Sequence, residues 1–153
     1  MINLYALAGL NKGMVLSTDN YTEWLTGFWT IHGDQGDFGM IQNLWKTEVY
    51  KMSEYIANNE YADDLSRRIA ITNCINAVPT DGLGISNSDL EQLGVDSYEE
   101  ADAIFQTYQG GNVTKNDRSA LNKHPLIQRF MATEHKRNNP YNIPRADIFT
   151  LAA

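Results

Sequence analysis

The stretch that most constrains the fold of this chain is residues 40–58, MIQNLWKTEVYKMSEYIAN. Its apolar side chains recur every three or four positions, which places them on one stripe of an α-helix. No glycine or proline interrupts the run, and the pair Asn58 and Asn59 follows it. Because asparagine tolerates the left-handed backbone that ends many helices, the pair is a natural stop. The stretch therefore predicts a long amphipathic helix with the buried stripe Met40, Ile41, Leu44, Trp45, Val49, Met52, Tyr55 and Ile56.

A second long helix is predicted over residues 61–78, and Pro79 ends it. From Ile69 onward this segment is apolar around much of its circumference, which is typical of a helix at the centre of a domain. The joint between the two helices is short. It favours either an antiparallel hairpin or one long bent helix.

Shorter helices are expected at residues 21–31, 89–93, 98–109 and 126–137. Ser88 and Ser97 each stand three residues before a glutamate, the spacing of a capping box. Pro125 suits a first helical position, where its missing N–H costs nothing. The chain therefore reads as a series of helices joined by polar turns.

The N-terminal residues 1–16 alternate in part between apolar and polar side chains, with the turn signal Asn11-Lys12-Gly13 between two apolar runs. Both a short hairpin and an extended arm lying on a neighbouring subunit fit this pattern. The predicted fold class is mainly α: a compact bundle of four to five helices, with a small N-terminal β-hairpin as an option and an extended C-terminal tail.

A chain of 153 residues fits one domain. We expect an N-terminal hairpin or arm and loop over residues 1–37, a helical core over 38–137, and a C-terminal docking tail over 138–153. Two prolines make the tail extended, and its apolar residues give it an anchor.

The net charge of −7 argues against a broad nucleic-acid surface, which needs clustered lysine and arginine. No apolar run is long enough to cross a membrane, and no signal peptide is visible. The expected location is therefore the cytoplasm or a virion, without a membrane partner.

Residues that could hold a metal are scattered. His32, His124 and His135 form no HxH or HExxH spacing, and the single cysteine, Cys74, lies in an apolar run. The phosphate-binding pattern GxxxxGK[ST] is absent too. We expect neither a metal nor a cofactor.

The glycine-rich segment 32–39, HGDQGDFG, leads directly into the first long helix. Both a functional loop and a simple lead-in to the helix fit it. With the following Met40-Ile41-Gln42, residues 33–42 resemble the segment after the catalytic glutamate of goose-type lysozymes and lytic transglycosylases. The resemblance implies a cell-wall hydrolase with Glu23 as general acid. Glu23 follows a polar run rather than an apolar helix, which departs from that family's pattern.

The hypothesis that we favour is a non-enzymatic structural or assembly protein. No catalytic set stands out, and the style of the sequence, acidic with 8 Tyr and 4 Pro, resembles that of small phage virion proteins such as head–tail connector, neck, capsid or decoration subunits. We expect protein partners, by self-association or with neighbouring virion subunits. The predicted contacts in the tail are Tyr141, Ile143, Ile148, Phe149 and Leu151.

A further alternative is an acidic inhibitor or adaptor that binds a host protein. The acidic segment 86–109 would supply the contact, with Glu99 and Glu100 at its centre.

Overall fold

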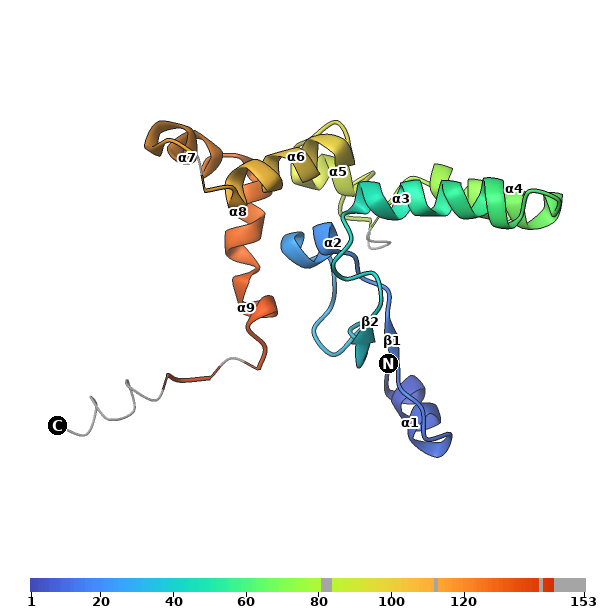
Figure 1. The fold of residues 1–153 in the computed structure, drawn as a ribbon. Coiled ribbons are helices and arrows are strands. Elements are labelled where there is room, and N and C mark those ends of the chain that lie inside the picture. The colour runs from blue at the N-terminus through green and yellow to red at the C-terminus, as the bar shows by residue number, and fades with distance from the viewer. Residues whose placement is uncertain (81–83, 112, 141, 145–153) are drawn as a thin grey trace.

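The body of the molecule forms where four helices bring their apolar side chains together. They are α2 Tyr21–Thr26, α5 Asp89–Leu93, α6 Tyr98–Gln109 and α8 Pro125–Ala132. The structure, a computed structural model, describes residues 1–80, 84–111, 113–140 and 142–144. Figure 1 shows two projections from this body, the α3–α4 pair and α1, so the chain is branched rather than a compact bundle. The buried core consists of Leu25, Leu93, Val95, Tyr98, Ala101, Phe105, Leu126 and Ile127.

The predicted helix over residues 40–58 is real, but it is shorter and lies at the periphery. Helix α3 is Lys46–Tyr55 and continues as a π-helical turn, Ile56–Glu60. Trp45 is the N-cap residue, because its backbone N–H donates to the Glu48 carboxylate at 2.9 Å and so starts the helix there. No residue of α3 is buried, so its apolar stripe does not form the centre of the core.

Helix α4, Leu65–Asn76, folds back beside α3 as an antiparallel hairpin, and the Asp64 side chain caps it by accepting from Arg67 N. The hairpin option is therefore confirmed (Figure 1). Burial of this helix at the centre of the domain was expected and is wrong, because none of the twelve residues of α4 is buried. In the structure the two helices form a projecting arm.

The N-terminal segment is a helix, α1 Ile2–Leu10, and neither a hairpin nor an extended arm. The Asn11 side chain donates to Leu7 O at 2.8 Å and closes its last turn. A short strand follows, β1 Leu16–Ser17, which pairs in parallel with β2 Phe38–Gly39 across α2. Alternation over a few residues did not distinguish the helix from strands, since nearly every residue of the segment is apolar or small.

The capping predictions in the second half are confirmed. The side chains of Ser88 and Ser97 accept from the third N–H of α5 and α6, and Pro125 occupies the first turn of α8. The helix expected over 126–137 is divided at Thr133 into α8 and α9 Glu134–Arg137. Thr133 Oγ1 bonds Arg129 O at 2.9 Å and so competes with the helical hydrogen bonds. A further helix, α7 Lys115–Leu121, precedes them.

Beyond α9 the described residues form no helix or strand: Asn138 lies in a turn and Pro140 in a bend. Ile143 is 63% exposed. Tyr141, Ile148, Phe149 and Leu151 lie outside the described residues. Among the described helices, none is long and apolar enough to cross a membrane.

Candidate ligand-binding site

Helix α2 carries the first charged residue of the site, Glu23, and its position follows from local sequence. The Asn20 side chain accepts from Glu23 N, and Asn20 N donates back to Glu23 Oε2, both at 3.1 Å. This reciprocal capping box fixes the start of the helix. The other carboxylate oxygen, Oε1, lies 2.7 Å from Lys46 Nζ at the start of α3. Glu23 therefore joins α2 to the base of the arm.

A buried aspartate holds the same two helices from the other side. Asp102 of α6 is 2% exposed and accepts from Thr22 Oγ1 at 2.6 Å and from Thr47 Oγ1 at 2.8 Å. Thr22 Oγ1 in turn accepts from Lys46 N at 2.9 Å. Because a buried carboxylate is costly unless its oxygens are hydrogen-bonded, these donors determine how α2, α3 and α6 meet.

The C-terminal end of α2 is covered by basic side chains from α8 and α9. Arg137 Nη1 donates to Leu25 O at 2.8 Å and Arg129 Nε donates to Thr26 O at 2.9 Å. Lys136 Nζ donates to Gly27 O at 2.7 Å. These carbonyls lack helical partners and carry the negative end of the helix dipole, which favours cations there. Gly27 has φ 67°, and a Cβ at this position would lie 2.6 Å from Thr133 Cβ, so the close approach requires glycine.

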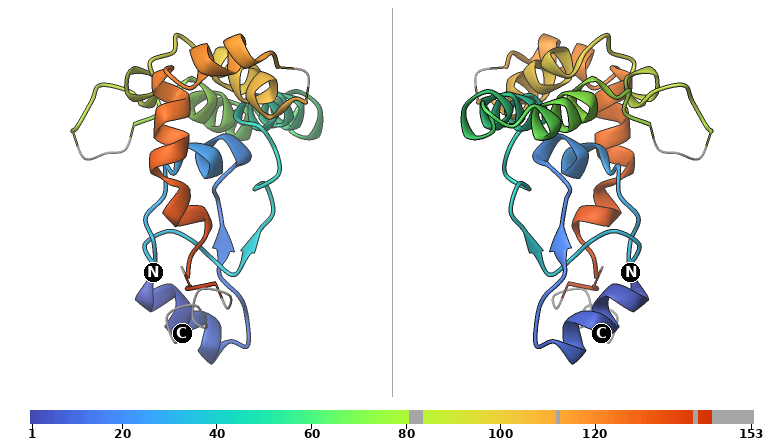
Figure 2. Two further views of the ribbon diagram at one scale, coloured as in Figure 1. Left: turned by 90° about the vertical axis from the view of Figure 1, so that its left-hand side faces the viewer. Right: turned by 90° about the vertical axis from the view of Figure 1, so that its right-hand side faces the viewer.

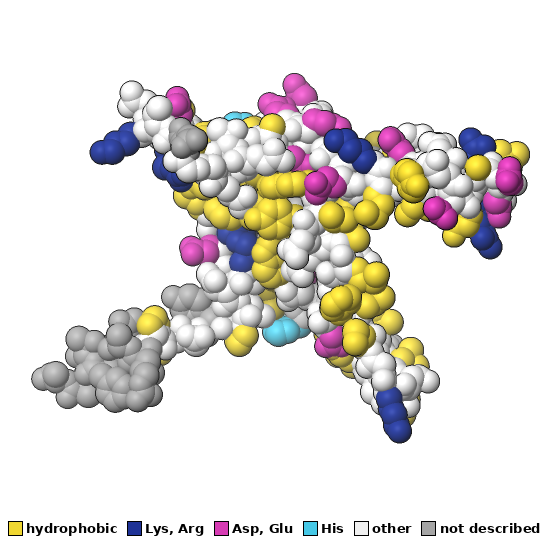
Figure 3. Space-filling view, in the orientation of Figure 1, with side chains coloured by type: hydrophobic (Ala, Val, Ile, Leu, Met, Phe, Trp, Pro, Cys, Tyr) yellow, Lys and Arg dark blue, Asp and Glu magenta, His cyan; other side chains and the backbone are white. Residues whose placement is uncertain are grey.

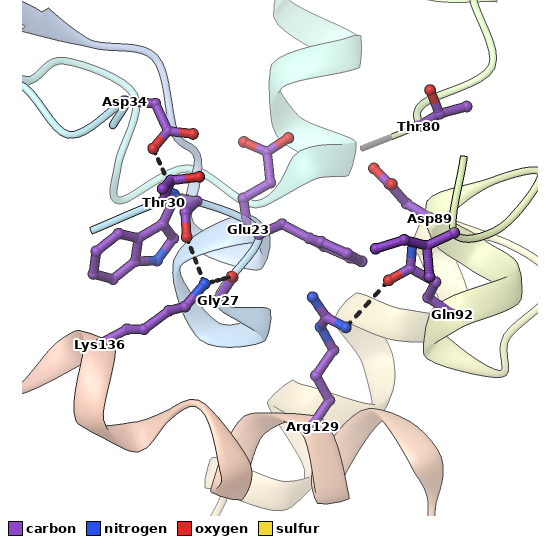
Figure 4. Close-up of a pocket in the computed structure, with 12 residues that line it drawn as sticks. Glu23, Gly27, Thr30, Asp34, Thr80, Asp89, Gln92, Arg129 and Lys136 are labelled. Carbon is purple, nitrogen blue, oxygen red and sulfur yellow. Dashed lines mark hydrogen bonds between the residues drawn. The ribbon is translucent and has the colours of Figure 1, made fainter. Parts of the chain in front are cut away.

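Between these elements lies a cavity of about 560 Å³, within the usual range for small-molecule sites. Figure 4 shows Lys136 and Arg129 reaching into it from α9 and α8, with Glu23 and Asp34 opposite and Thr80, Asp89 and Gln92 along one side. Three carboxylates and two cations thus converge from segments far apart in sequence. The lining residues are Glu23, Gly27, Phe28, Trp29, Thr30, Asp34, Thr80, Ile85, Asp89, Gln92, Arg129 and Lys136.

The end of the cavity that Lys136 and Arg129 line favours an anion. Burial lowers the pKa of Lys136 from its ordinary value, and the nearby charge of Arg129 lowers it further. An anionic ligand would offset both effects. Arg129 stacks 4.0 Å over the Phe28 ring, and Trp29 lies parallel to Trp24 at 5.2 Å. The buried Trp29 Nε1 donates to no acceptor among the described residues. This end of the cavity therefore offers two cations beside the half-buried Phe28 ring.

Of the residues singled out from sequence, only Glu23 lines this cavity. Its carboxylate is engaged by Lys46, whereas a general acid must carry a proton to donate. His32 lies outside the cavity, in a left-handed conformation with φ 61°. The segment 32–39 nevertheless contributes Asp34, whose carboxylate accepts from Thr30 N. Glu99 and Glu100 are exposed in the first turn of α6. In the described part of the chain, no three His, Cys, Asp or Glu residues gather to hold a metal.

Sequence reasoning missed Asp89, Arg129 and Lys136. Each lies on a helix that was predicted, but nothing local marks them as converging on α2. Lys136 and Arg137, at the end of α9, donate to carbonyls at the C-terminal end of α2.

Comparison with known proteins decides the family. The family model described as NAD synthase matches residues 1–140 of this chain, which include every residue that lines the cavity. This chain belongs to the NAD synthase family. The NH3-dependent NAD+ synthetase of Thermoplasma acidophilum is 33% identical over 147 residues, covering 95% of this chain and 54% of that protein. That of Finegoldia magna is 30% identical over 138 residues, covering 90% and 48%.

A solved structure agrees with this assignment. NMN synthetase from Francisella tularensis matches with a TM-score of 0.62 and 25% identity, over 94% of this chain and 52% of that one. The chain therefore spans about half the length of the relatives that it matches.

Family membership overturns several expectations. A mainly α free bundle is wrong as a fold class, because the family to which the chain belongs has a Rossmann-like α/β fold. The structural, virion, cell-wall hydrolase and acidic-inhibitor hypotheses are wrong as well, since the relatives are synthetases. A protein of this family is an enzyme or part of one, contrary to the expectation of a non-enzyme.

Proposed function

We propose that this chain contributes the cavity in which an ammonia-dependent NAD+ synthetase binds its dinucleotide. The observation that carries the proposal is the convergence of five charged side chains on one cavity inside the family-matched residues 1–140. The relatives from Thermoplasma acidophilum and Finegoldia magna are named as NH3-dependent NAD+ synthetases, which favours the dinucleotide over the mononucleotide of the Francisella tularensis neighbour.

The reaction follows from the chemistry of the product. The amide nitrogen of NAD+ comes from ammonia, so the precursor carries a carboxylate in place of the carboxamide. A free carboxylate is a poor electrophile. We therefore expect a nucleoside triphosphate to activate it, and ammonia to displace the activating group with formation of the C–N bond. Binding energy spent on the remote parts of the dinucleotide would orient the reacting carboxylate.

Within the cavity, Arg129 and Lys136 suit the phosphates of a dinucleotide. Phe28, half-buried in the wall of the cavity, presents aromatic surface to a ring. Asp34 lies across the cavity from the two cations (Figure 4), where a carboxylate accepts hydrogen bonds from ribose hydroxyls or attracts an ammonium ion. Such an enzyme would act in the cytoplasm. Self-association stays a prediction.

The test is equilibrium binding of NAD+ to the purified chain, followed by tryptophan fluorescence because Trp29 lines the cavity. We expect saturable quenching by NAD+, with weaker binding of NMN, which lacks the second nucleotide. Arg129→Gln should weaken NAD+ binding by about tenfold, the effect of removing one charge-assisted hydrogen bond worth about 1.4 kcal/mol.

The matched control is Arg118→Gln, because Arg118 stacks on Tyr108 at 4.9 Å outside the cavity. Circular dichroism would confirm that both variants fold. Equal NAD+ affinity of the two variants, or no saturable binding at millimolar NAD+, would contradict the proposal.

A further inference from the structure

The buried carboxylate of Asp102 takes no direct part in the proposed site. Figure 3 shows acidic side chains at the surface, over the body and along the α3–α4 arm. Asp102 is instead 2% exposed and does not line the cavity. Because an apolar side chain of similar size would avoid the cost of burying a charge, the contacts of Asp102 indicate its role.

Both oxygens of Asp102 are directed to the start of α3. Oδ2 accepts from Thr47 N at 3.2 Å and from Thr47 Oγ1 at 2.8 Å. Oδ1 accepts from Thr22 Oγ1 at 2.6 Å, and this hydroxyl in turn accepts from Lys46 N at 2.9 Å. Lys46 and Thr47 carry the first two backbone N–H groups of α3, which have no acceptor within their own helix. Asp102 therefore anchors the first turn of α3, both directly and through Thr22.

The side chain of Lys46 connects this first turn to the cavity. Its ammonium lies 2.7 Å from Glu23 Oε1. The rings of Tyr50 and Tyr98 lie 5.6 Å and 5.4 Å from the same ammonium. The lysine thus passes two aromatic rings and ends on one carboxylate. A shift of the first turn of α3 would separate Lys46 from Glu23.

This ion pair determines the charge of one wall of the cavity. Glu23 lines the same cavity as Arg129 and Lys136 (Figure 4). While it is paired with Lys46, its carboxylate adds little net charge there. An unpaired Glu23 carboxylate would repel the phosphates of a dinucleotide. At the effective dielectric constant of a protein, one such charge weakens binding on the order of tenfold.

We propose that Asp102 is a positioning residue for the cavity: it holds the first turn of α3 so that Lys46 stays paired with Glu23. Asp102 acts through Thr22 and Thr47 and touches no ligand. Its effect on binding rests on the proposed function, whereas the position of Lys46 depends on no ligand. The two proposals can therefore fail separately.

The first test needs no ligand and follows the NMR signal of the Lys46 ammonium group. An ammonium held by a carboxylate exchanges its protons with water slowly enough to be observed, and the loss of the signal in Lys46→Met assigns it. We expect the signal in the wild type and in Thr22→Ser, which keeps the hydroxyl. It should be lost in Thr22→Val and in Asp102→Asn, whose amide nitrogen would face the Thr47 N–H. The matched control is Asp96→Asn, the same change at an exposed position, which should keep the signal.

The second test is a double-mutant cycle on NAD+ affinity, measured by tryptophan fluorescence. Asp102→Asn should weaken NAD+ binding on the order of tenfold in the wild-type background. In the Glu23→Gln background the same substitution should change the affinity by less than about twofold, because the carboxylate that it would leave unpaired is absent. A merely structural role would give equal losses in both backgrounds. Circular dichroism would confirm that all variants fold.

Two results would overturn the proposal. One is a Lys46 ammonium signal that persists in both Asp102→Asn and Thr22→Val. The other is an equal loss of NAD+ affinity on Asp102→Asn in the presence and absence of the Glu23 carboxylate. If the wild type does not bind NAD+, the proposed function fails, and the ammonium signals alone decide whether Asp102 positions Lys46.

Discussion

At the scale of single residues, buried carboxylates organise this molecule. Asp102 has three donors from Thr22 and Thr47 around it, whereas the buried Asp19 has Ser17 as its side-chain donor. Asp102 thus stabilises the junction of α2, α3 and α6. At Asp19, by contrast, burial disfavours the charged carboxylate.

Replacing Asp102 by alanine should lower the free energy of unfolding by about 3 kcal/mol, because the buried donors of Thr22 and Thr47 lose their acceptor. Urea denaturation would measure this. Asp96→Ala, at an exposed position near the same helix, should change the value by about 0.5 kcal/mol or less. Equal losses in the two variants would show that Asp102 is not the junction described above.

Asp19 makes stability depend on pH. Burial raises its pKa above the usual value, an effect that the Ser17 hydrogen bond partly offsets. An acid with a raised pKa in the folded state contributes stability that is fully present below its unfolded pKa and is lost as pH rises through the folded pKa. Asp19→Asn should therefore gain stability over the wild type as pH rises from about 4 to 7. Denaturation across that range would test it, and a constant difference would contradict it.

At the scale of elements, α2 is held at both ends by other helices. Its first turn is joined to α3 through Lys46, and its last carbonyls accept from α8 and α9. With six residues, α2 is far too short to be stable alone. Its geometry, and with it the position of Glu23, depends on these partners.

Arg137→Met should destabilise the protein by about 2 kcal/mol, since the apolar stem remains over Phe130 while the donors to Leu25 O and Phe130 O are lost. Arg67→Met is the control, because its ion pair with Asp64 is exposed and worth about 0.5 kcal/mol. Thermal or urea unfolding would compare the two. A loss for Arg137→Met as small as that for the control would mean that α9 does not support α2.

At the scale of the whole molecule, burial is concentrated in the body and is sparse in the projections. Figure 2 shows, from two sides, α1 hanging below the strands and the α3–α4 pair lying beside the body. Phe105 is fully buried among α2, α5, α6 and α8, while Leu65 on the arm is 67% exposed. Stability should follow this division.

Phe105→Ala should cost about 3–5 kcal/mol, a large share of the 5–15 kcal/mol that typically holds a domain folded. Leu65→Ala should cost well under about 1 kcal/mol, because the side chain is already in water. Urea denaturation followed by circular dichroism would measure both. A cost for Leu65→Ala approaching that of Phe105→Ala would mean that a second copy covers the arm in solution.

The sequence by itself determined the local features of this protein. Ser88, Ser97 and Pro125 mark helix starts correctly because capping is decided by atoms within one turn. The apolar stripes of residues 40–58 and 61–78 also identify two helices that pack as a hairpin. In the candidate site, the capping box of α2 could be recognised locally, and Glu23 was singled out through a family resemblance that proved wrong.

Only the tertiary structure decided which stripes are buried and which charges meet. An apolar stripe has the same sequence pattern whether it packs against the same chain or against another polypeptide. Apolar periodicity therefore predicted α3 and α4 at the centre of the domain, whereas they form an exposed arm. Likewise, Lys136 lies near Glu23 only because α9 returns to the end of α2. Contacts between residues so far apart in sequence depend on how the helices pack, and no pattern of neighbouring residues predicts that packing.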